Sequence, residues 1–169
     1  MNDDYWPSPP LTARSASTNR AWTHPNIRRC ESVIRCGVCV PQLFQHSDEL
    51  EDAWRAYELA REATERGEGR ARWLTAAAYD RWLMYQSKPQ KYRTQYVHDS
   101  VRHRLWDVDT TTTDAERAAW DVPPLAEQLH KAEEATRIDP PQPINLDDTP
   151  WWLKQALLLW KRNAGASDG

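Results

Sequence analysis

Apolar residues recur at helical spacing along much of the chain, and breaks in this pattern divide it into segments. After Ser47, the residues Leu50, Trp54 and Tyr57 fall on one helical face. Ser47 is a suitable residue to cap this helix, and Gly67 is typical of a helix end. The spacing therefore predicts an amphipathic helix between these two positions.

A second helix is predicted from about residue 70 to residue 86. Leu74 and Tyr85 fall on one flank of it, and Asp80 and Met84 fall on another. Because apolar residues cover more than one flank, we expect this helix to be buried on more than one side.

The remaining elements are shorter or less regular. Residues 92–97 and 101–108 alternate in a way that favours a short hairpin. Three further helices are expected: one after Asn26 that breaks or kinks at Pro41, a short one capped by Asp114 that ends near Trp120, and one from Leu125 to Arg137.

These elements predict a mainly α protein, a single-domain irregular helical bundle with a short β-hairpin near 92–108. A chain of 169 residues is long enough to bury a core of this kind. The expected regions are a flexible N-terminal tail (1–21), a helical core domain (22–137), a Pro-rich linker (138–149) and a C-terminal amphipathic helix (150–163).

Composition excludes several classes of partner. The 22 basic and 25 acidic residues give a net charge of −3, so nothing favours binding to nucleic acid. No apolar run approaches the roughly 20 residues that a membrane helix needs. The N-terminus lacks a basic stretch followed by an apolar one, so we expect no secretory signal and a cytoplasmic protein. The ten Trp residues predict a Trp-rich core, an aromatic-lined ligand pocket, or both.

The cysteines raise the question of a metal. Cys36 and Cys39 form a Cys-x2-Cys pair near His24 and His46, which is one half of a zinc-site pattern. On a helix through this region, His46 would lie about 10 Å beyond Cys39 along the axis. We therefore expect small buried thiols and no cofactor. A zinc site using Cys36, Cys39 and a His, or a redox pair of the two cysteines, are the alternatives.

A set of polar residues stands where a helical bundle would carry apolar ones. A buried polar group without a partner costs roughly 1–3 kcal/mol, so these residues should form a connected network. The set consists of Gln45, His46, Asp80, Arg81, Gln90, Tyr92 and Gln95.

These positions also carry a resemblance. The strings Gln45-His46, Asp80-Arg81 and Pro89-Gln90-Lys91-Tyr92-Arg93-Thr94-Gln95, with Asp114-Ala115-Glu116-Arg117 and Val122-Pro123-Pro124-Leu125, resemble a widespread family of small bacterial proteins of unknown function. The likeness covers about residues 22–134 and implies a mostly helical fold. Arg93 stands where the family has Gly. A Gly there suits a backbone conformation that Arg adopts with difficulty, which puts inherited chemistry in question.

The first functional hypothesis is a cofactor-independent enzyme acting on a small molecule in specialised metabolism, of lyase, cyclase, isomerase or hydrolase type. His46 would be the general acid/base, since an unperturbed His titrates near pH 6.5. Asp80 would orient His46 or pair with Arg81, and Tyr92 would donate a proton. The expected substrate-binding residues are Gln45, Arg81, Gln90 and Gln95.

The alternative is a non-catalytic binding or immunity-type protein that keeps the polar network for structure. Gln90 and Gln95 would then hold backbone groups in a loop. The C-terminal helix would dock on its own core, on a second copy or on a partner protein, because it carries the apolar residues Trp151, Trp152 and Leu158. His98 and His103 are expected on the surface.

Overall fold

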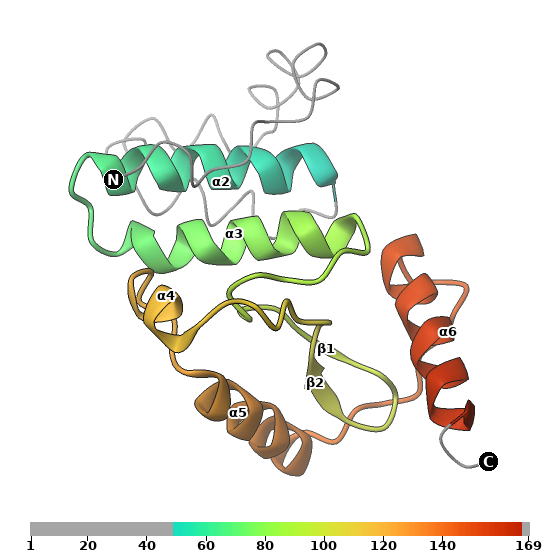
Figure 1. Ribbon diagram of the computed structural model, residues 1–169. Coiled ribbons are helices and arrows are strands. Elements are labelled where there is room, and N and C mark those ends of the chain that lie inside the picture. Colours follow the sequence, from blue (N-terminus) through green and yellow to red (C-terminus); the bar gives the residue numbers. More distant parts are fainter. Residues whose placement is uncertain (1–48, 167–169) are drawn as a thin grey trace.

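The computed structural model describes the backbone of residues 49–166 and the side chains of residues 49–160. This part of the chain is mainly α with a two-stranded antiparallel hairpin, as the sequence predicts (Figure 1). The expected helix after Asn26 and the N-terminal tail lie outside it. The elements are α2 (Leu50–Glu65), α3 (Ala71–Tyr85), β1 (Tyr96–His98), β2 (His103–Leu105), α4 (Asp114–Ala118), α5 (Leu125–Ile138) and α6 (Trp151–Ala166).

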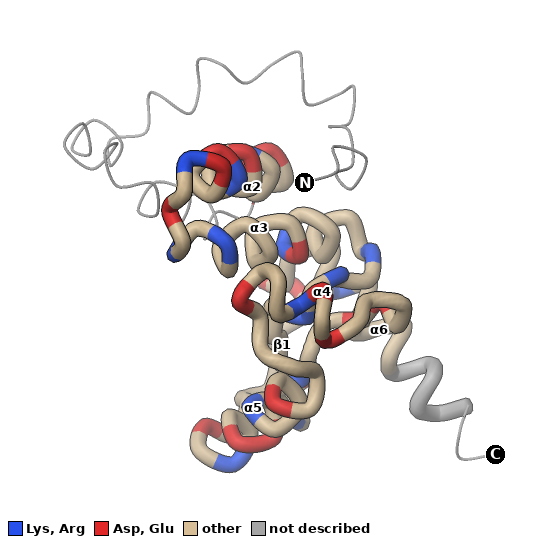
Figure 2. Tube along the Cα trace, turned by 60° about the vertical axis from the view of Figure 1, so that its left-hand side comes forward, with Lys and Arg blue, Asp and Glu red and all other residues tan. Residues whose placement is uncertain are grey.

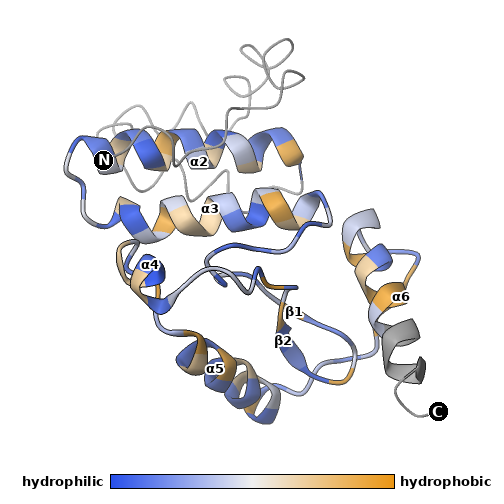
Figure 3. Ribbon diagram, in the orientation of Figure 1, coloured by the Kyte–Doolittle hydropathy of each residue, from blue (hydrophilic) through white to orange (hydrophobic). Residues whose placement is uncertain are grey.

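Helices α2 and α3 lie side by side in antiparallel directions (Figure 1). Their contact is rich in alanine, and Ala53, Ala56 and Ala78 are completely buried. Small side chains let two helix backbones approach closely, because little volume lies between them. Figure 2 shows acidic and basic residues along α2, and Figure 3 shows hydrophilic and hydrophobic segments alternating along α2 and α5.

The turn between α2 and α3 is made by Gly67, whose φ of 90° is in the left-handed region. Its N–H donates to the Thr64 carbonyl, and the next N–H donates to the Ala63 carbonyl, as in a Schellman ending. The predicted helix end is confirmed. The predicted Ser47 cap is wrong, because Glu49 occupies the N-cap position of α2 and makes no side-chain capping bond.

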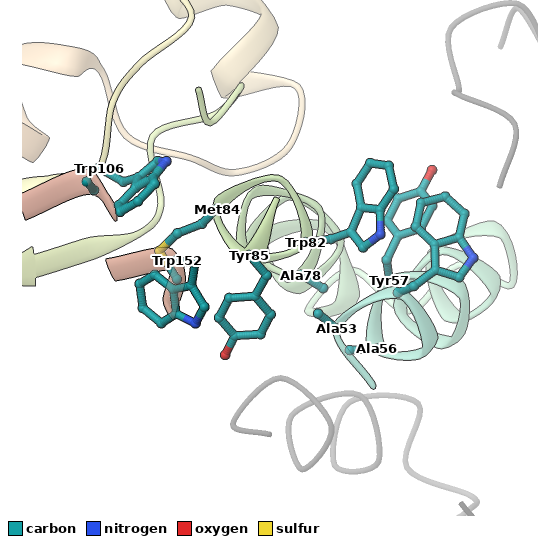
Figure 4. Close-up of a cluster of buried hydrophobic side chains, with 11 residues drawn as sticks. Ala53, Ala56, Tyr57, Ala78, Trp82, Met84, Tyr85, Trp106 and Trp152 are labelled. Carbon is teal, nitrogen blue, oxygen red and sulfur yellow. The ribbon is translucent and has the colours of Figure 1, made fainter. Parts of the chain in front are cut away.

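Tryptophan and tyrosine side chains dominate the core between α2, α3 and the hairpin (Figure 4). The Trp54 ring lies 4.8 Å from the Trp82 ring, and both pack against buried alanines. Paired aromatic rings contribute about 0.5–1.5 kcal/mol beyond the area they bury. The expected Trp-rich core is therefore confirmed.

Helix α6 docks on this core through one face. Trp152 is 8% exposed and lies 5.1 Å from the Tyr85 ring, and it meets Trp106 edge to face. Trp160 donates its Nε1–H to Asp107 at 2.8 Å. Trp151, by contrast, is 59% exposed. Of the docking alternatives, the described chain therefore shows α6 docking on its own core.

The hairpin and the two remaining helices form the lower layer in Figure 1. Tyr96 pairs with Leu105 and His98 pairs with His103, which confirms the predicted hairpin. The predicted cap of α4 is wrong by one residue: Thr113 occupies the N-cap position and forms a capping box with Glu116. No helix in the described part of the chain is both long and apolar enough to cross a membrane.

Candidate functional site

Asp80 lies in the middle of α3 and is completely buried. Its carboxylate accepts hydrogen bonds from the backbone N–H groups of Lys91 (2.7 Å), Tyr92 (2.9 Å) and Thr94 (3.0 Å), and from the Thr94 hydroxyl (2.8 Å). Burial raises the pKa of Asp80 to about 6, although these four donors favour the ionised form. Asp80 thus anchors the 91–94 loop to α3.

Gln95 continues this anchoring one residue further along the loop. Its amide nitrogen donates to the Ala77 carbonyl of α3 at 2.9 Å, and its amide oxygen accepts from the Arg81 Nε–H at 3.0 Å. Arg81 is therefore held by Gln95, and the structure shows no ion pair between Arg81 and Asp80. Adjacent helical residues point about 100° apart, so each serves a different part of the loop.

Gln90 links the beginning of the loop to its end. Its side-chain nitrogen donates to the carbonyls of Gln95 (3.1 Å) and Trp106 (2.9 Å), and its side-chain oxygen accepts from the Gln95 N–H (2.8 Å). Its backbone also bonds the segment after β2, through the Asp107 carbonyl and the Asp109 N–H. The Gln90 side chain therefore bonds backbone groups of Gln95 and Trp106, while its own backbone forms an isolated parallel bridge with Val108.

Tyr92 fills the space between the loop and the short helix α4. It is completely buried, with the Tyr79 ring 6.4 Å and the Trp120 ring 6.2 Å from its own. Its backbone N–H is one of the Asp80 donors. In the described structure, Tyr92 is a core residue that Asp80 helps to place.

Arg93 adopts a φ of 69°, in the left-handed region that favours Gly. The resemblance to the family indicated a backbone conformation here that suits Gly, and Arg93 adopts such a conformation. A residue with a β-carbon costs roughly 1–2 kcal/mol in this conformation. The surrounding bonds of Asp80, Gln90 and Gln95 supply the constraint that holds it there.

A second set of hydrogen bonds joins α4 to α5. The Asp114 carboxylate accepts from Arg117 Nη2 at 2.6 Å and from the Leu125 N–H at 3.0 Å. Arg117 is buried, and it also donates to the Thr112 carbonyl. The positions of the Asp-x-x-Arg and Pro-Pro-Leu strings therefore contact each other.

A groove of about 570 Å³ lies between the segment from β2 to residue 110 and helix α5. Its walls are mostly apolar, with Leu105, Val108, Leu129 and Ala132 among them. This volume is within the usual range for small-molecule sites. Figure 1 shows β2 and α5 next to each other, and both elements contribute residues to the groove lining.

The structure brings five of the sequence-predicted site residues into one network: Asp80, Arg81, Gln90, Tyr92 and Gln95. The groove adjoins this network through Arg93, which the sequence marked only as a departure from the family pattern. His103, expected on the surface, is half-buried and lines the groove. The residues that line the groove could not be identified from the sequence, because they come from three separate segments of the chain.

Gln45, His46, Cys36 and Cys39 lie outside the residues that the structure describes. The acid/base role of His46 and the metal alternative therefore stay predictions. Within residues 49–160, no three His, Cys, Asp or Glu side chains gather closely enough to hold a metal ion.

Comparison of the chain with models of protein families, with curated proteins and with solved structures finds no match.

Proposed function

We propose that this protein is a non-catalytic binding protein, in which the buried polar network supports the fold and the groove between β2 and α5 receives a ligand. One observation carries the proposal. Asp80 and Gln90 are 0% exposed and Gln95 is 3% exposed, and all three bond backbone groups. A catalytic acid or base must come within hydrogen-bond reach of its substrate, and groups that are both enclosed and already bonded to the backbone do not.

The network positions the groove. Gln90 bonds the segment from Trp106 to Asp109, which forms one wall, and the loop from 91 to 95 carries Arg93 to the end of that wall. Thr136 accepts from the His103 N–H at 2.8 Å and so fixes α5 against β2. A groove built on such paired elements is largely formed before a ligand arrives, which lowers the entropic cost of binding.

Leu129 offers a test of this proposal. It lines the groove and is 47% exposed, so a larger side chain can occupy the groove without disturbing the core. We expect compounds that raise the melting temperature of the wild type to lose that effect in Leu129→Trp. Leu158→Trp, on the exposed side of α6, is the matched control. Binding that is equally strong in Leu129→Trp would contradict the proposal, as would chemical conversion of the bound compound.

The second candidate is the acid/base enzyme with His46. The observation in its favour is Arg81, which is only partly buried while Gln95 fixes its Nε. A guanidinium placed in this way can bind a substrate anion with its terminal nitrogens. The test is conversion of a substrate by His46→Ala and His46→Gln. Survival of the activity at the wild-type rate in both variants rules this candidate out.

We also propose membership of the bacterial family that the motifs resemble. The support is the φ of 69° at Arg93, the position at which that family carries Gly. The contacts between Asp114, Arg117 and Leu125 add to it, because they join two of the family-like strings.

A further inference from the structure

We propose that the ligand of the groove is a small organic carboxylate with an apolar body, and that Arg93 binds its carboxylate. This inference rests on the proposed binding function and names the ligand class. It goes beyond the polar network, because Arg93 takes no part in anchoring the loop to α3.

The argument begins with the state of the Arg93 guanidinium. Arg93 is 4% exposed and lines the groove. Its Nη2 donates to the Asp109 carbonyl at 3.3 Å, whereas Nε and Nη1 have no hydrogen-bond partner. An arginine keeps its charge in proteins, and a buried charge without a counter-ion is costly. Nε and Nη1 are buried, so a carboxylate in the groove reaches them when the Arg93 side chain turns toward it, and the two donors then match its two oxygens.

The nearby carboxylates are already committed to other donors. Asp109 accepts from the Thr111 N–H at 2.9 Å and from its hydroxyl at 2.7 Å. Asp114 accepts from Arg117 and from the Leu125 N–H. Neither forms an ion pair with Arg93 among the described residues. Asp109 and Asp114 therefore attract the Arg93 charge from a distance, and neither carboxylate contacts its guanidinium.

The other two cations of the groove wall, Arg102 and Arg104, are in a different state. Arg102 is exposed and lies 3.9 Å from the Asp99 carboxylate. Arg104 lies within 4.0 Å of both Asp99 and Asp107, and its guanidinium stacks 3.9 Å from the centre of the Trp160 ring. Its charge is balanced and its face is covered. Arg93 is therefore the better anion-binding group in the described part of the groove.

The arrangement of α5 gives the ligand a direction. Arg93 lies near the first turn of α5, since Asp114 beside it bonds the Leu125 N–H. The Asp114 carboxylate already occupies the positive end of the α5 dipole, so the attraction for a ligand anion comes from Arg93. Glu133 lines the groove eight residues further, which is about 12 Å along the helix axis and would repel an anion. Leu129 and Ala132 lie between, so an apolar body fits the middle.

The test uses octanoate and 4-phenylbutyrate as probes, with their uncharged amides as controls, in calorimetric titrations of the full chain. Arg93→Gly removes the guanidinium, and Gly accepts the φ of 69° without strain, so this variant keeps the fold. We expect Arg93→Gly to bind the carboxylates at least about tenfold more weakly, because a charge-assisted bond is lost. Its affinity for the amides should not change.

Arg55→Gln is the matched control, since it removes one positive charge from the exposed surface of α2. It should bind the carboxylates as the wild type does. Equal affinity of wild type and Arg93→Gly for both carboxylates overturns the inference, and so does equal affinity of the wild type for acid and amide. If Leu129→Trp still abolishes binding in those cases, the groove remains the ligand site and only the ligand class is wrong. If Leu129→Trp binds as the wild type does, the proposed function fails as well.

Discussion

Replacing Asp80 with Ala tests the anchoring role of this residue. The substitution leaves three backbone N–H groups, those of Lys91, Tyr92 and Thr94, without their acceptor. Each buried donor without a partner costs about 1–3 kcal/mol, so the loss is about 6 kcal/mol at the middle of that range. The substitution also removes a buried charge. Burial raises the pKa of this carboxyl and its four donors lower it, and the net result is a pKa of about 6 in place of 3.8. That relief is worth about 3 kcal/mol.

The net expectation is a fall of about 3 kcal/mol in the free energy of unfolding at pH 7. Such a loss is a large part of the 5–15 kcal/mol that a typical domain has. Urea unfolding followed by tryptophan fluorescence measures it, since Trp54 and Trp82 lie in the affected core. Hydrogen exchange of the Lys91, Tyr92 and Thr94 amides should accelerate more than that of the other protected amides.

Asp147→Ala is the control, because Asp147 is exposed and the change in net charge is the same. It should alter the free energy of unfolding by less than about 0.5 kcal/mol. If Asp80→Ala changes stability by as little as the control does, or leaves the exchange of the three amides unaltered, the anchoring role of Asp80 is refuted.

Three other features of the structure can be tested by urea unfolding: the pKa of Asp80, the backbone of Arg93 and the docking of α6. The pKa of Asp80 is higher in the folded than in the unfolded state, so the folded protein takes up a proton between about pH 6 and pH 4, and this uptake stabilises the wild type. The loss of stability caused by Asp80→Ala should therefore grow as the pH falls through that window. A loss that shrinks on acidification contradicts this. Arg93→Gly should raise the free energy of unfolding by about 1 kcal/mol in urea, since it relieves the left-handed strain; a loss of stability would show that Arg93 is not strained. Trp152→Ala should cost about 3–5 kcal/mol by the same assay, whereas the exposed Trp151→Ala should cost little; equal effects would mean that α6 does not dock as described.

Helical spacing alone predicted the long elements well. The expected helix from about residue 70 to residue 86 is α3, and the expected helix from Leu125 to Arg137 is α5, each within one residue. These predictions hold because the periodicity of apolar residues acts within each segment, and the predicted end of α2 holds because Gly67 stops that helix locally. Two of the helix starts that were placed on a capping residue, at Ser47 and Asp114, are wrong. Several Ser, Thr, Asp and Glu residues precede each helix, and local sequence does not select among them.

The polar network was predicted as a set but not in its connections. The sequence showed that Asp80, Gln90 and Gln95 needed partners, since each stands among apolar residues. Only the tertiary structure decided that these partners are backbone groups of residues 91–95, of Trp106 and of α3, because a loop can reach α3 in many ways. Arg93 illustrates the difference most clearly. Its departure from Gly was visible in the chain, whereas its burial beside a groove depends on three segments meeting in space.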